Sequence, residues 1–491
     1  MPKSLLNMPR KLSHFINNQW TPFQGESIDI QSPLNGQVIG TISKSSTFDI
    51  QSAIHAAEKA NQEWKKTPIK ERSRIFFNLR NILLEKKELI SQCIHIESGK
   101  TLDEAKAGLL KGIEVIEFAL SLQNIDLGGK KEVSRGVFCE YRREPLGITA
   151  GITPFNFPAM VPLWMIPIAL VTGNAFIWKP SEKTPLTSYF IAESFKEAGL
   201  PAGLFNVLQG DAQTAKDLVN HPQIAALGFV GSTPVAQSIY KEGAATGKRI
   251  LAMGGAKNHI FLLPDAPPEF TAQAIVDSFT GCAGQRCMAA SVLLAIGETQ
   301  KMIDSILKVA SQKQAGKNLG AIISKESLDR LHKAIETASE HGAQIILDGR
   351  NPSVDSQFQG GFWLNPTILD HVSPQSEAAQ KELFGPVLSI IRCKDIEEAL
   401  EIENKNPFGN AASVFTQKGA LAEFVAQNAN AGMIGINIGV PVPREPFSFG
   451  GFYASRFGQG DITGMDGVRF WTQTKKITSK WGSQSPINWM S

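Results

Sequence analysis

The spacing of apolar and polar positions changes several times along the chain, and each change predicts an element. Residues 14–43 hold short β-type runs broken by Asn17-Asn18, Pro33 and Asn35-Gly36, which predicts surface hairpins. Residues 49–97 and 102–122 carry apolar side chains three and four positions apart among many charges, which predicts helices. Residues 159–171 are almost continuously apolar but too few to cross a bilayer, so we expect a buried helix.

A different pattern begins at Gly147, where short apolar runs bounded by Gly or Pro alternate with helical spacing. Strands are predicted at 148–152, 175–178, 205–208 and 226–230, and helices at 185–198, 211–219 and 233–247. After Cys287 a second series predicts strands at 291–296, 343–347, 387–392 and 411–415, and helices at 298–312 and 324–341. Such alternation indicates parallel sheets covered on both faces. We therefore predict an α/β protein with two lobes, each built on an open parallel sheet.

Two further segments predict a β extension made from distant parts of the chain. Residues 128–131 (Gly-Gly-Lys-Lys) interrupt the helical pattern, and residues 133–143 alternate like one exposed strand. Residues 472–481 are predicted to form another strand. The length of 491 residues supports more than one domain, because single cores stop growing at roughly 250–300 residues.

Charge and cysteine content narrow the class of protein. A net charge of +3 on 491 residues gives no reason to expect a nucleic-acid or membrane partner. The five cysteines are odd in number and scattered, which argues against a disulfide framework and leads us to expect a cytoplasmic protein. Cys282 and Cys287 have no histidine nearby, so we expect no metal site.

Residues 281–289 are the strongest candidate for covalent chemistry. They place Cys287 in a turn rich in Gly and Ala, directly after Arg286. A thiol reacts as the thiolate, which a cationic neighbour and oriented N–H groups favour. The alternative is a buried cysteine that acts only as a small hydrophobic residue.

Two strand-to-helix junctions are candidates for binding a nucleotide, because such ligands bind at the carboxyl ends of parallel strands. After the strand at 175–178, Lys179 could donate to a ribose or phosphate and Glu182 could accept from ribose hydroxyls. A carboxylate there repels a 2′-phosphate and favours NAD over NADP. At the second junction, Ser232 and a helix start suit a pyrophosphate. The alternative for both junctions is a helix cap.

Two other polar residues follow breaks in the chain. Asn156 lies in a Pro- and Phe-rich turn after the strand at 148–152, where its amide could donate to an oxyanion; the alternative is a turn asparagine bonded to its own backbone. Glu382 precedes a Phe-Gly-Pro break and could hold a second ribose. A solvated glutamate is the alternative there.

The stretches P-F-N-F-P, W-K-P-S-E-K-T-P, F-V-G-S-T, G-Q-R-C-M-A and E-L-F-G-P-V, in this order, resemble the aldehyde dehydrogenase superfamily over essentially the whole chain. The resemblance implies that Cys287 is the nucleophile and that Asn156 and the Cys287 N–H form the oxyanion hole. It also implies an NAD site made by a set of nine residues: Thr153, Phe155, Lys179, Glu182, Lys183, Gly231, Ser232, Glu382 and Phe384.

The same resemblance implies a division into three parts and an assembly. Residues 1–124 and 146–253 correspond to the NAD-binding domain, and residues 254–455 to the catalytic domain. Residues 125–145 and 470–491 correspond to a β extension that pairs subunits. A homotetramer is the assembly that this organisation implies.

One position points to a subgroup of the family. Most members carry E-L-G-G-K, whose Glu activates water, whereas this chain has Met253 at that place, and a thioether is no base. The stretches G-A-K-N-H, P-V-P and F-S-F, and the ending T-Q with I-T-S-K-W, are similar to the CoA-acylating methylmalonate-semialdehyde dehydrogenases. That similarity implies a substrate with a carboxylate beta to the aldehyde, loss of that carboxylate, and CoA as acyl acceptor, giving propionyl-CoA or acetyl-CoA in valine degradation or inositol catabolism.

Three cations are candidates for binding that carboxylate. Arg286 can match it with two parallel hydrogen bonds. Lys111 stands where the subgroup has the Arg of R-G-I-E, so the charge is kept and the guanidinium fork is lost. Arg444 is a further candidate that could contribute in its place. Two other functions stay open. The first is a hydrolytic NAD-dependent aldehyde dehydrogenase of another small semialdehyde, with a different carboxylate as base. The second is a catalytically silent family member that serves as a structural or binding protein.

Overall fold

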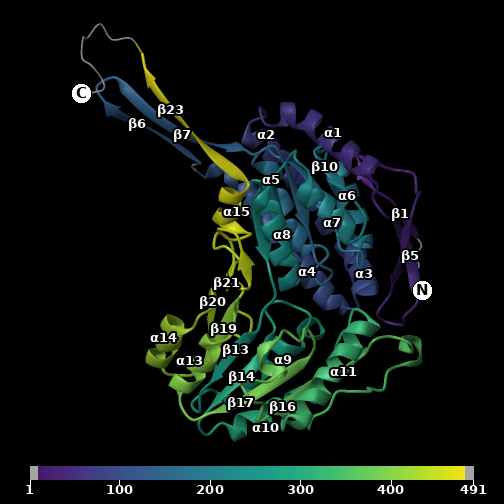
Figure 1. Ribbon diagram of the computed structural model, residues 1–491, viewed down its shortest axis with the longest axis vertical. Coiled ribbons are helices and arrows are strands. Elements are labelled where there is room, and N and C mark those ends of the chain that lie inside the picture. Colours follow the sequence, from purple (N-terminus) through teal and green to yellow (C-terminus); the bar gives the residue numbers. More distant parts are fainter. Residues whose placement is uncertain (1–8, 126, 482–491) are drawn as a thin grey trace.

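Two α/β lobes and a projecting β arm make up the computed structural model, which describes residues 9–125 and 127–481 (Figure 1). The first lobe is drawn in purple and teal and the second mainly in green; the arm leaves the first lobe at its far side. The α/β class and the parallel sheet in each lobe, predicted from the sequence, are confirmed.

The sheet of the first lobe has the order β22-β12-β11-β8-β9-β10-β2-β3. Its middle is parallel, and short antiparallel strands lie at both edges. Its strands are β8 (Ile148–Ile152), β9 (Ala175–Lys179), β10 (Phe205–Val207), β11 (Ile224–Val230), β12 (Arg249–Met253), β22 (Arg456–Phe457), β2 (Phe15–Ile16) and β3 (Gln19–Trp20). A small separate sheet holds β1 (Lys11–Leu12), β5 (Val38–Ser43) and β4 (Ser27–Gln31).

Helices cover both faces of this sheet, and one cluster of buried apolar side chains unites them with it. They are α1 (Thr47–Trp64), α2 (Ile69–Glu85), α3 (Lys87–Ser98), α4 (Leu102–Ser121), α5 (Met160–Val171), α6 (Leu186–Glu197), α7 (Ala212–Asn220) and α8 (Thr233–Ala245). Every residue of α5 after Met160 is buried, which confirms the buried helix predicted there. Of the helices in the described ranges, none is both long enough and apolar enough to span a membrane.

Helices α4 and α5 approach each other closely, and this packing places Lys111. A Cβ on Gly112 would lie 2.8 Å from Cδ1 of Leu163, so a larger residue would push the helices apart. Lys111, next to Gly112, is half-buried and lies at the margin where the first lobe meets the second.

The sheet of the second lobe has the order β15-β16-β17-β14-β13-β19-β20 and is parallel except at β15. Its strands are β13 (Asn258–Leu262), β14 (Ala290–Ile296), β15 (Gln344–Leu347), β16 (Thr367–Asp370), β17 (Val387–Cys393), β19 (Ala411–Phe415) and β20 (Met433–Ile436). Its principal helices are α9 (Pro268–Thr280), α10 (Gln300–Ala310), α11 (Lys325–Glu340), α13 (Ile396–Asn404) and α14 (Gly419–Asn428).

Alternate residues of the second sheet enter two different cores. Ile260 and Leu262 of β13 pack with α9 and α10, whereas Phe261 packs with α11, α13 and α14 on the other face. A strand that is buried on both faces needs apolar residues at every position. This explains the continuous apolar runs that mark these strands in the sequence.

The arm is built from β6 (Gly128–Ser134), β7 (Val137–Pro145) and β23 (Thr472–Lys480), in the order β23-β7-β6. Distant parts of the chain therefore share one sheet (blue and yellow in Figure 1). Residues 128–131 lie outside the preceding helix, as predicted, and begin β6. One prediction here is wrong: 133–143 is not one strand, because the chain turns at Arg135-Gly136, where Gly136 has φ +74°. Residues 482–491 of the predicted extension and 1–8 of the predicted first domain lie outside the described residues.

Candidate active site

The Cys287 turn leaves helix α9 through a left-handed bend. Cys282 and Ala283 have φ of 56° and 53°, a conformation that costs free energy for residues with a Cβ and that tends to persist at functional sites. Gly284 follows at φ +67°, and a Cβ there would lie 2.1 Å from the Gly385 carbonyl oxygen. The bend is thus pressed against the Gly-Pro break after Phe384, which brings two candidate motifs together.

Buried polar side chains hold this turn in place. The Cys287 carbonyl accepts from Nδ2 of Asn258 over 2.7 Å and from Nδ2 of Asn410 over 2.9 Å. Glu104 Oε1 accepts from the Cys282 N–H over 2.6 Å. Neither Asn258 nor Asn410 nor Glu104 was a candidate from the sequence. Their partners lie far along the chain, so only the folded structure identifies them.

Asn156 is bound to the turn that carries Cys287. Its Nδ2 donates to the Gln285 carbonyl over 3.0 Å, so its partner is not its own backbone, as the turn alternative required. The side chain is buried and lines the same cleft as Cys287. The second hydrogen of the amide stays available to an oxygen near the thiol.

A cleft of about 970 Å³ between the lobes collects the candidate cofactor residues. All nine line it, together with Asn156 and Cys287. Thr153 accepts from the Trp178 indole over 2.8 Å, and the rings of Phe155 and Phe384 meet edge to face at 5.8 Å. These residues are spread over more than two hundred positions of the sequence, and the fold brings them together along one cleft.

The helix-cap alternative is not realised at either nucleotide junction. The start of α6 is capped by Glu97 instead, which accepts from the N–H groups of Leu186 and Thr187 over 2.7 and 3.1 Å. At α8, no hydrogen bond from a helix N–H to the Ser232 hydroxyl is present in the described part of the chain. Both Glu182 and Ser232 therefore present side chains that the helices do not require.

Lys179 and Glu182 form an ion pair at the rim of the cleft. Nζ of Lys179 lies 3.1 Å from Oε2 of Glu182 and donates over 2.9 Å to the Pro180 carbonyl. Burial lowers the pKa of Lys179, and the Glu182 carboxylate opposes that shift. The pair offers one ammonium and one carboxylate to the same ligand group.

Glu382 lies deep in the cleft and is not a solvated glutamate. A Cβ on Gly255 would lie 2.4 Å from its Oε2, so the carboxylate rests on the backbone between the lobes. Burial raises the pKa of Glu382, and the Ala256 N–H, Lys257 and Arg330 oppose the shift. Burial lowers the pKa of Lys257, which Glu382 opposes.

The Cys287 thiol is protonated at neutral pH in this state. Burial, and after it the Glu382 carboxylate, raises the pKa of Cys287 to about 12, against the smaller opposing effects of its own N–H and Arg286. Met253 supplies no base, since its side chain is packed in the core of the first lobe. The carboxylates that line the cleft are Glu182, Asp211, Glu242 and Glu382.

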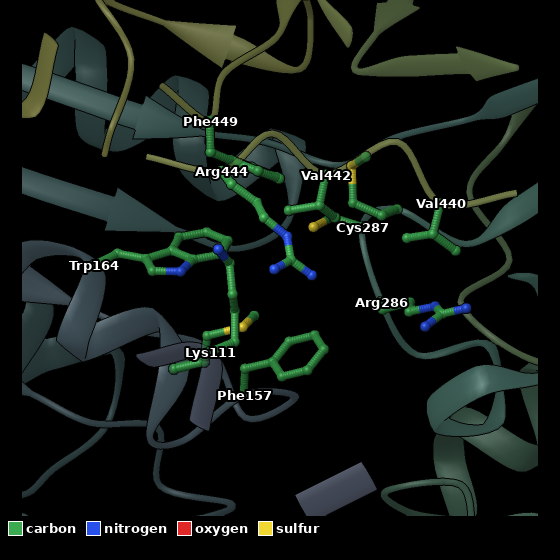
Figure 2. Close-up of a pocket in the computed structure, with 11 residues that line it drawn as sticks. Lys111, Phe157, Trp164, Arg286, Cys287, Val440, Val442, Arg444 and Phe449 are labelled. Carbon is green, nitrogen blue, oxygen red and sulfur yellow. The ribbon is translucent and has the colours of Figure 1, made fainter. Parts of the chain in front are cut away.

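A smaller cavity of about 250 Å³ opens on the other side of Cys287 (Figure 2). Phe157, Trp164 and Phe449 give it aromatic walls, and Lys111, Arg286 and Arg444 give it positive charge. Arg444 and Lys111 extend into its middle, whereas the Arg286 guanidinium points away from the centre. Nη2 of Arg286 donates to the Asp277 carbonyl and, over 2.9 Å, to the Ser278 carbonyl at the end of α9. The described residues include no group of three or more His, Cys, Asp or Glu that could hold a metal ion.

Cys287 lies between a nucleotide-sized cleft and a small cavity, on a pair of parallel sheets. This is the arrangement of a nucleotide-dependent dehydrogenase. The model of the aldehyde dehydrogenase family matches residues 20–477. The chain belongs to the aldehyde dehydrogenase family, and the resemblance inferred from the sequence motifs is confirmed.

Two relatives indicate which members of the family this chain resembles. The chain is 38% identical to malonate-semialdehyde dehydrogenase 2 of Geobacillus kaustophilus over 96% of this chain and 99% of the relative. It is also 38% identical to the malonate-semialdehyde dehydrogenase of Pseudomonas aeruginosa, over 96% of each chain.

Solved structures agree with this result. A Sinorhizobium meliloti protein named as a methylmalonate-semialdehyde dehydrogenase, in complex with NAD, superposes with a TM-score of 0.95 at 37% identity, over 97% of this chain and 99% of that one. The methylmalonate-semialdehyde dehydrogenase of Oceanimonas doudoroffii gives 0.94 at 36%, over 96% and 99%.

Proposed function

We propose that this protein oxidises malonate or methylmalonate semialdehyde with NAD and transfers the resulting acyl group to CoA. The observation that carries the proposal is the position of Cys287 between two cavities of different character. The large cleft has the carboxylates and helix start that suit a dinucleotide, and the small cavity has the cations and aromatic walls that suit a small acid. The names of the relatives support the same substrates.

The residues of the cleft fit NAD as the cofactor. Glu182 is proposed to accept from ribose hydroxyls and to repel a 2′-phosphate. The Ser232 hydroxyl and the first N–H groups of α8 are suited to a pyrophosphate. Glu382 is buried deeper and is assigned to the second ribose. Bound NAD⁺ supplies the hydride acceptor.

The oxidation begins at sulfur. Cys287 Sγ attacks the aldehyde carbon, its proton leaves to water in the open cleft, and the carbonyl oxygen becomes an alkoxide. Asn156 Nδ2 and the Cys287 N–H are proposed to stabilise that charge, an interaction worth roughly 3–4 kcal/mol in comparable sites. Loss of hydride then leaves a thioester on Cys287. The cations at the small cavity are proposed to hold the substrate carboxylate until it leaves as CO2 or bicarbonate.

The absence of a base at residue 253 favours acyl transfer to a thiol. A CoA thiolate that attacks the thioester restores Cys287 and gives acetyl-CoA from malonate semialdehyde or propionyl-CoA from the methylated substrate. Hydrolysis is the rival, because the Glu382 carboxylate is close enough to Cys287 to raise the pKa of the thiol and could activate water.

The test is steady-state NADH formation from both semialdehydes, with NAD or NADP and with or without CoA. We expect activity with NAD, strong dependence on CoA, and none in Cys287→Ala. Formation of free acid at the full rate without CoA would favour the hydrolytic enzyme. A protein that binds NAD but turns over no aldehyde would be the silent family member.

We also infer that the arm pairs subunits into a homotetramer that works in the cytoplasm. Strands β6 and β23 are mostly exposed along an arm that projects from the first lobe (Figure 1). The five cysteines are free, as in a reducing compartment. Light scattering on the purified protein tests the assembly, and a monomer would contradict it.

A further inference from the structure

We propose that Arg444 selects the carboxylated substrate, and that Lys111 serves to position the loop that carries Arg444. This inference rests on the proposed function and assigns the carboxylate contact within it. Three cations line the small cavity, and they differ in the groups that contact them.

The positive charge of Lys111 is already balanced by carboxylates. Its Nζ lies 2.8 Å from Oε2 of Glu114 and 3.3 Å from Oε2 of Glu445, so two carboxylates surround one ammonium. The Glu445 side chain is largely buried, at 11% exposure, and water screens the pair only partly. A substrate carboxylate would have to displace these partners or approach them against like-charge repulsion.

The guanidinium of Arg286 is held at the end of helix α9. Its guanidinium lies across the backbone of Gly281, where a Cβ would come within 2.6 Å of Cζ. From there Nη2 donates to the two carbonyls at the end of α9, where the helix dipole favours a cation. Both N–H groups of Nη2 are used in this way. Nε, which is buried and has no partner within residues 9–125 and 127–481, and Nη1 keep three N–H donors, but the guanidinium points away from the centre of the cavity (Figure 2).

Arg444 differs from both of these cations. In the described structure its guanidinium makes neither a hydrogen bond nor an ion pair, and Figure 2 shows it reaching into the middle of the cavity. It is exposed, so it keeps its charge without a desolvation cost until a ligand covers it. An uncommitted guanidinium can offer two parallel N–H donors to a carboxylate.

The Lys111–Glu445 pair explains why Arg444 is held there. Glu445 is the next residue along the chain, and its ion pair joins the Arg444 loop, which follows β20, to helix α4 of the first lobe. Lys111 is therefore a positioning residue. Removing Glu445 would release the lysine charge toward the cavity.

The test compares kcat/KM for malonate semialdehyde with kcat/KM for butanal, an uncharged aldehyde of similar length. In Arg444→Leu we expect this ratio to fall by roughly a hundredfold, because the lost contact is made to the carboxylate, which butanal lacks. Arg444→Lys should fall in between, because it keeps the charge and loses the fork. Arg350→Leu removes a surface guanidinium paired with Asp348 and should leave the ratio unchanged.

A double variant tests whether Glu445 balances the charge of Lys111. Arg444→Leu with Glu445→Gln should regain part of the ratio, because Lys111 loses one of its two carboxylates. An unchanged ratio in Arg444→Leu, or its loss in Arg286→Gln with Arg444 intact, would overturn the inference. If the wild type itself does not prefer malonate semialdehyde to butanal, the proposed function falls instead.

Discussion

Asn156 donates from Nδ2 to the Gln285 carbonyl over 3.0 Å, which joins the turn after β8 to the turn that carries Cys287. The two lobes thus fix the amide relative to the thiol before any ligand arrives. A donor that is already oriented costs no reorganisation when charge develops on the substrate oxygen.

Replacing this amide should impair the chemical step and spare cofactor binding. In Asn156→Ala we expect kcat to fall by roughly 10²–10³. The dissociation constant of NADH, followed by fluorescence, should change little. Asn220→Ala, at the exposed end of α7, is the matched control. A fall in NADH affinity as large as the fall in kcat would instead indicate a collapsed site.

The pKa of Cys287 predicts a steep pH dependence of alkylation. Burial and Glu382 raise that pKa to about 12, so the thiolate fraction at Cys287 should increase roughly tenfold per pH unit from pH 7 to 9. Iodoacetamide labelling, read at this residue by peptide mass spectrometry, should increase in the same way. Glu382→Gln removes the neighbouring charge and should speed labelling at each pH. A rate independent of pH would mean that the thiol is already ionised.

Glu182 should control the choice between the two dinucleotides. We expect Glu182→Gln to raise the KM for NAD by roughly tenfold, since a hydrogen bond to a charged acceptor is lost. The KM for NADP should fall, because the repulsion of its 2′-phosphate is removed. Glu58→Gln, on the exposed face of α1, should change neither constant. Equal effects on both cofactors would show that Glu182 lies away from the ribose.

Much of this site could be predicted because its parts are local. An apolar run that ends in Thr153 or Lys179 gives both the strand and the residue at its end. The supports of Cys287 are not local. Asn410 lies 123 positions after it, and Glu104 lies 178 positions before Cys282, so no spacing in the sequence joins them.

The arm shows a second limit of the sequence pattern. Gly128 and Gly129 interrupt the helical pattern, but glycine weakens strands, so nothing local predicts the strand that they begin. Their backbones nevertheless pair with Arg142 and Tyr141, and a Cβ on Gly128 would lie 2.8 Å from the Tyr141 carbonyl oxygen. The partner strand, rather than local preference, decides the conformation there.

Glu97 has a structural carboxyl group that no pattern in the sequence singles out. It is fully buried and caps α6 through the N–H groups of Leu186 and Thr187 and the Thr187 hydroxyl. Glu97→Ala would leave these donors unpaired, and we expect the free energy of unfolding to fall by about 2–4 kcal/mol in denaturant titrations. A loss below about 0.5 kcal/mol would contradict this role.

The same carboxyl predicts a pH effect on stability. Burial raises the pKa of Glu97 from 4.5 to about 8, so the folded protein holds this proton more tightly than the unfolded chain does. The contribution is complete below pH 4.5 and is lost as the pH rises toward 8. In Glu97→Gln, the difference in unfolding free energy from the wild type should therefore shrink over that range. A difference that does not change with pH would mean that Glu97 ionises normally.

In the proposed mechanism, a thioester on Cys287 persists until CoA arrives. The decisive experiment mixes the enzyme with NAD⁺ and malonate semialdehyde in the absence of CoA. We predict a burst of NADH that matches the number of active sites and then stops, with an acetyl group found on Cys287 by mass spectrometry. Adding CoA should restart turnover and yield acetyl-CoA. Continued NADH formation without CoA, with acetate as the product, would contradict the account.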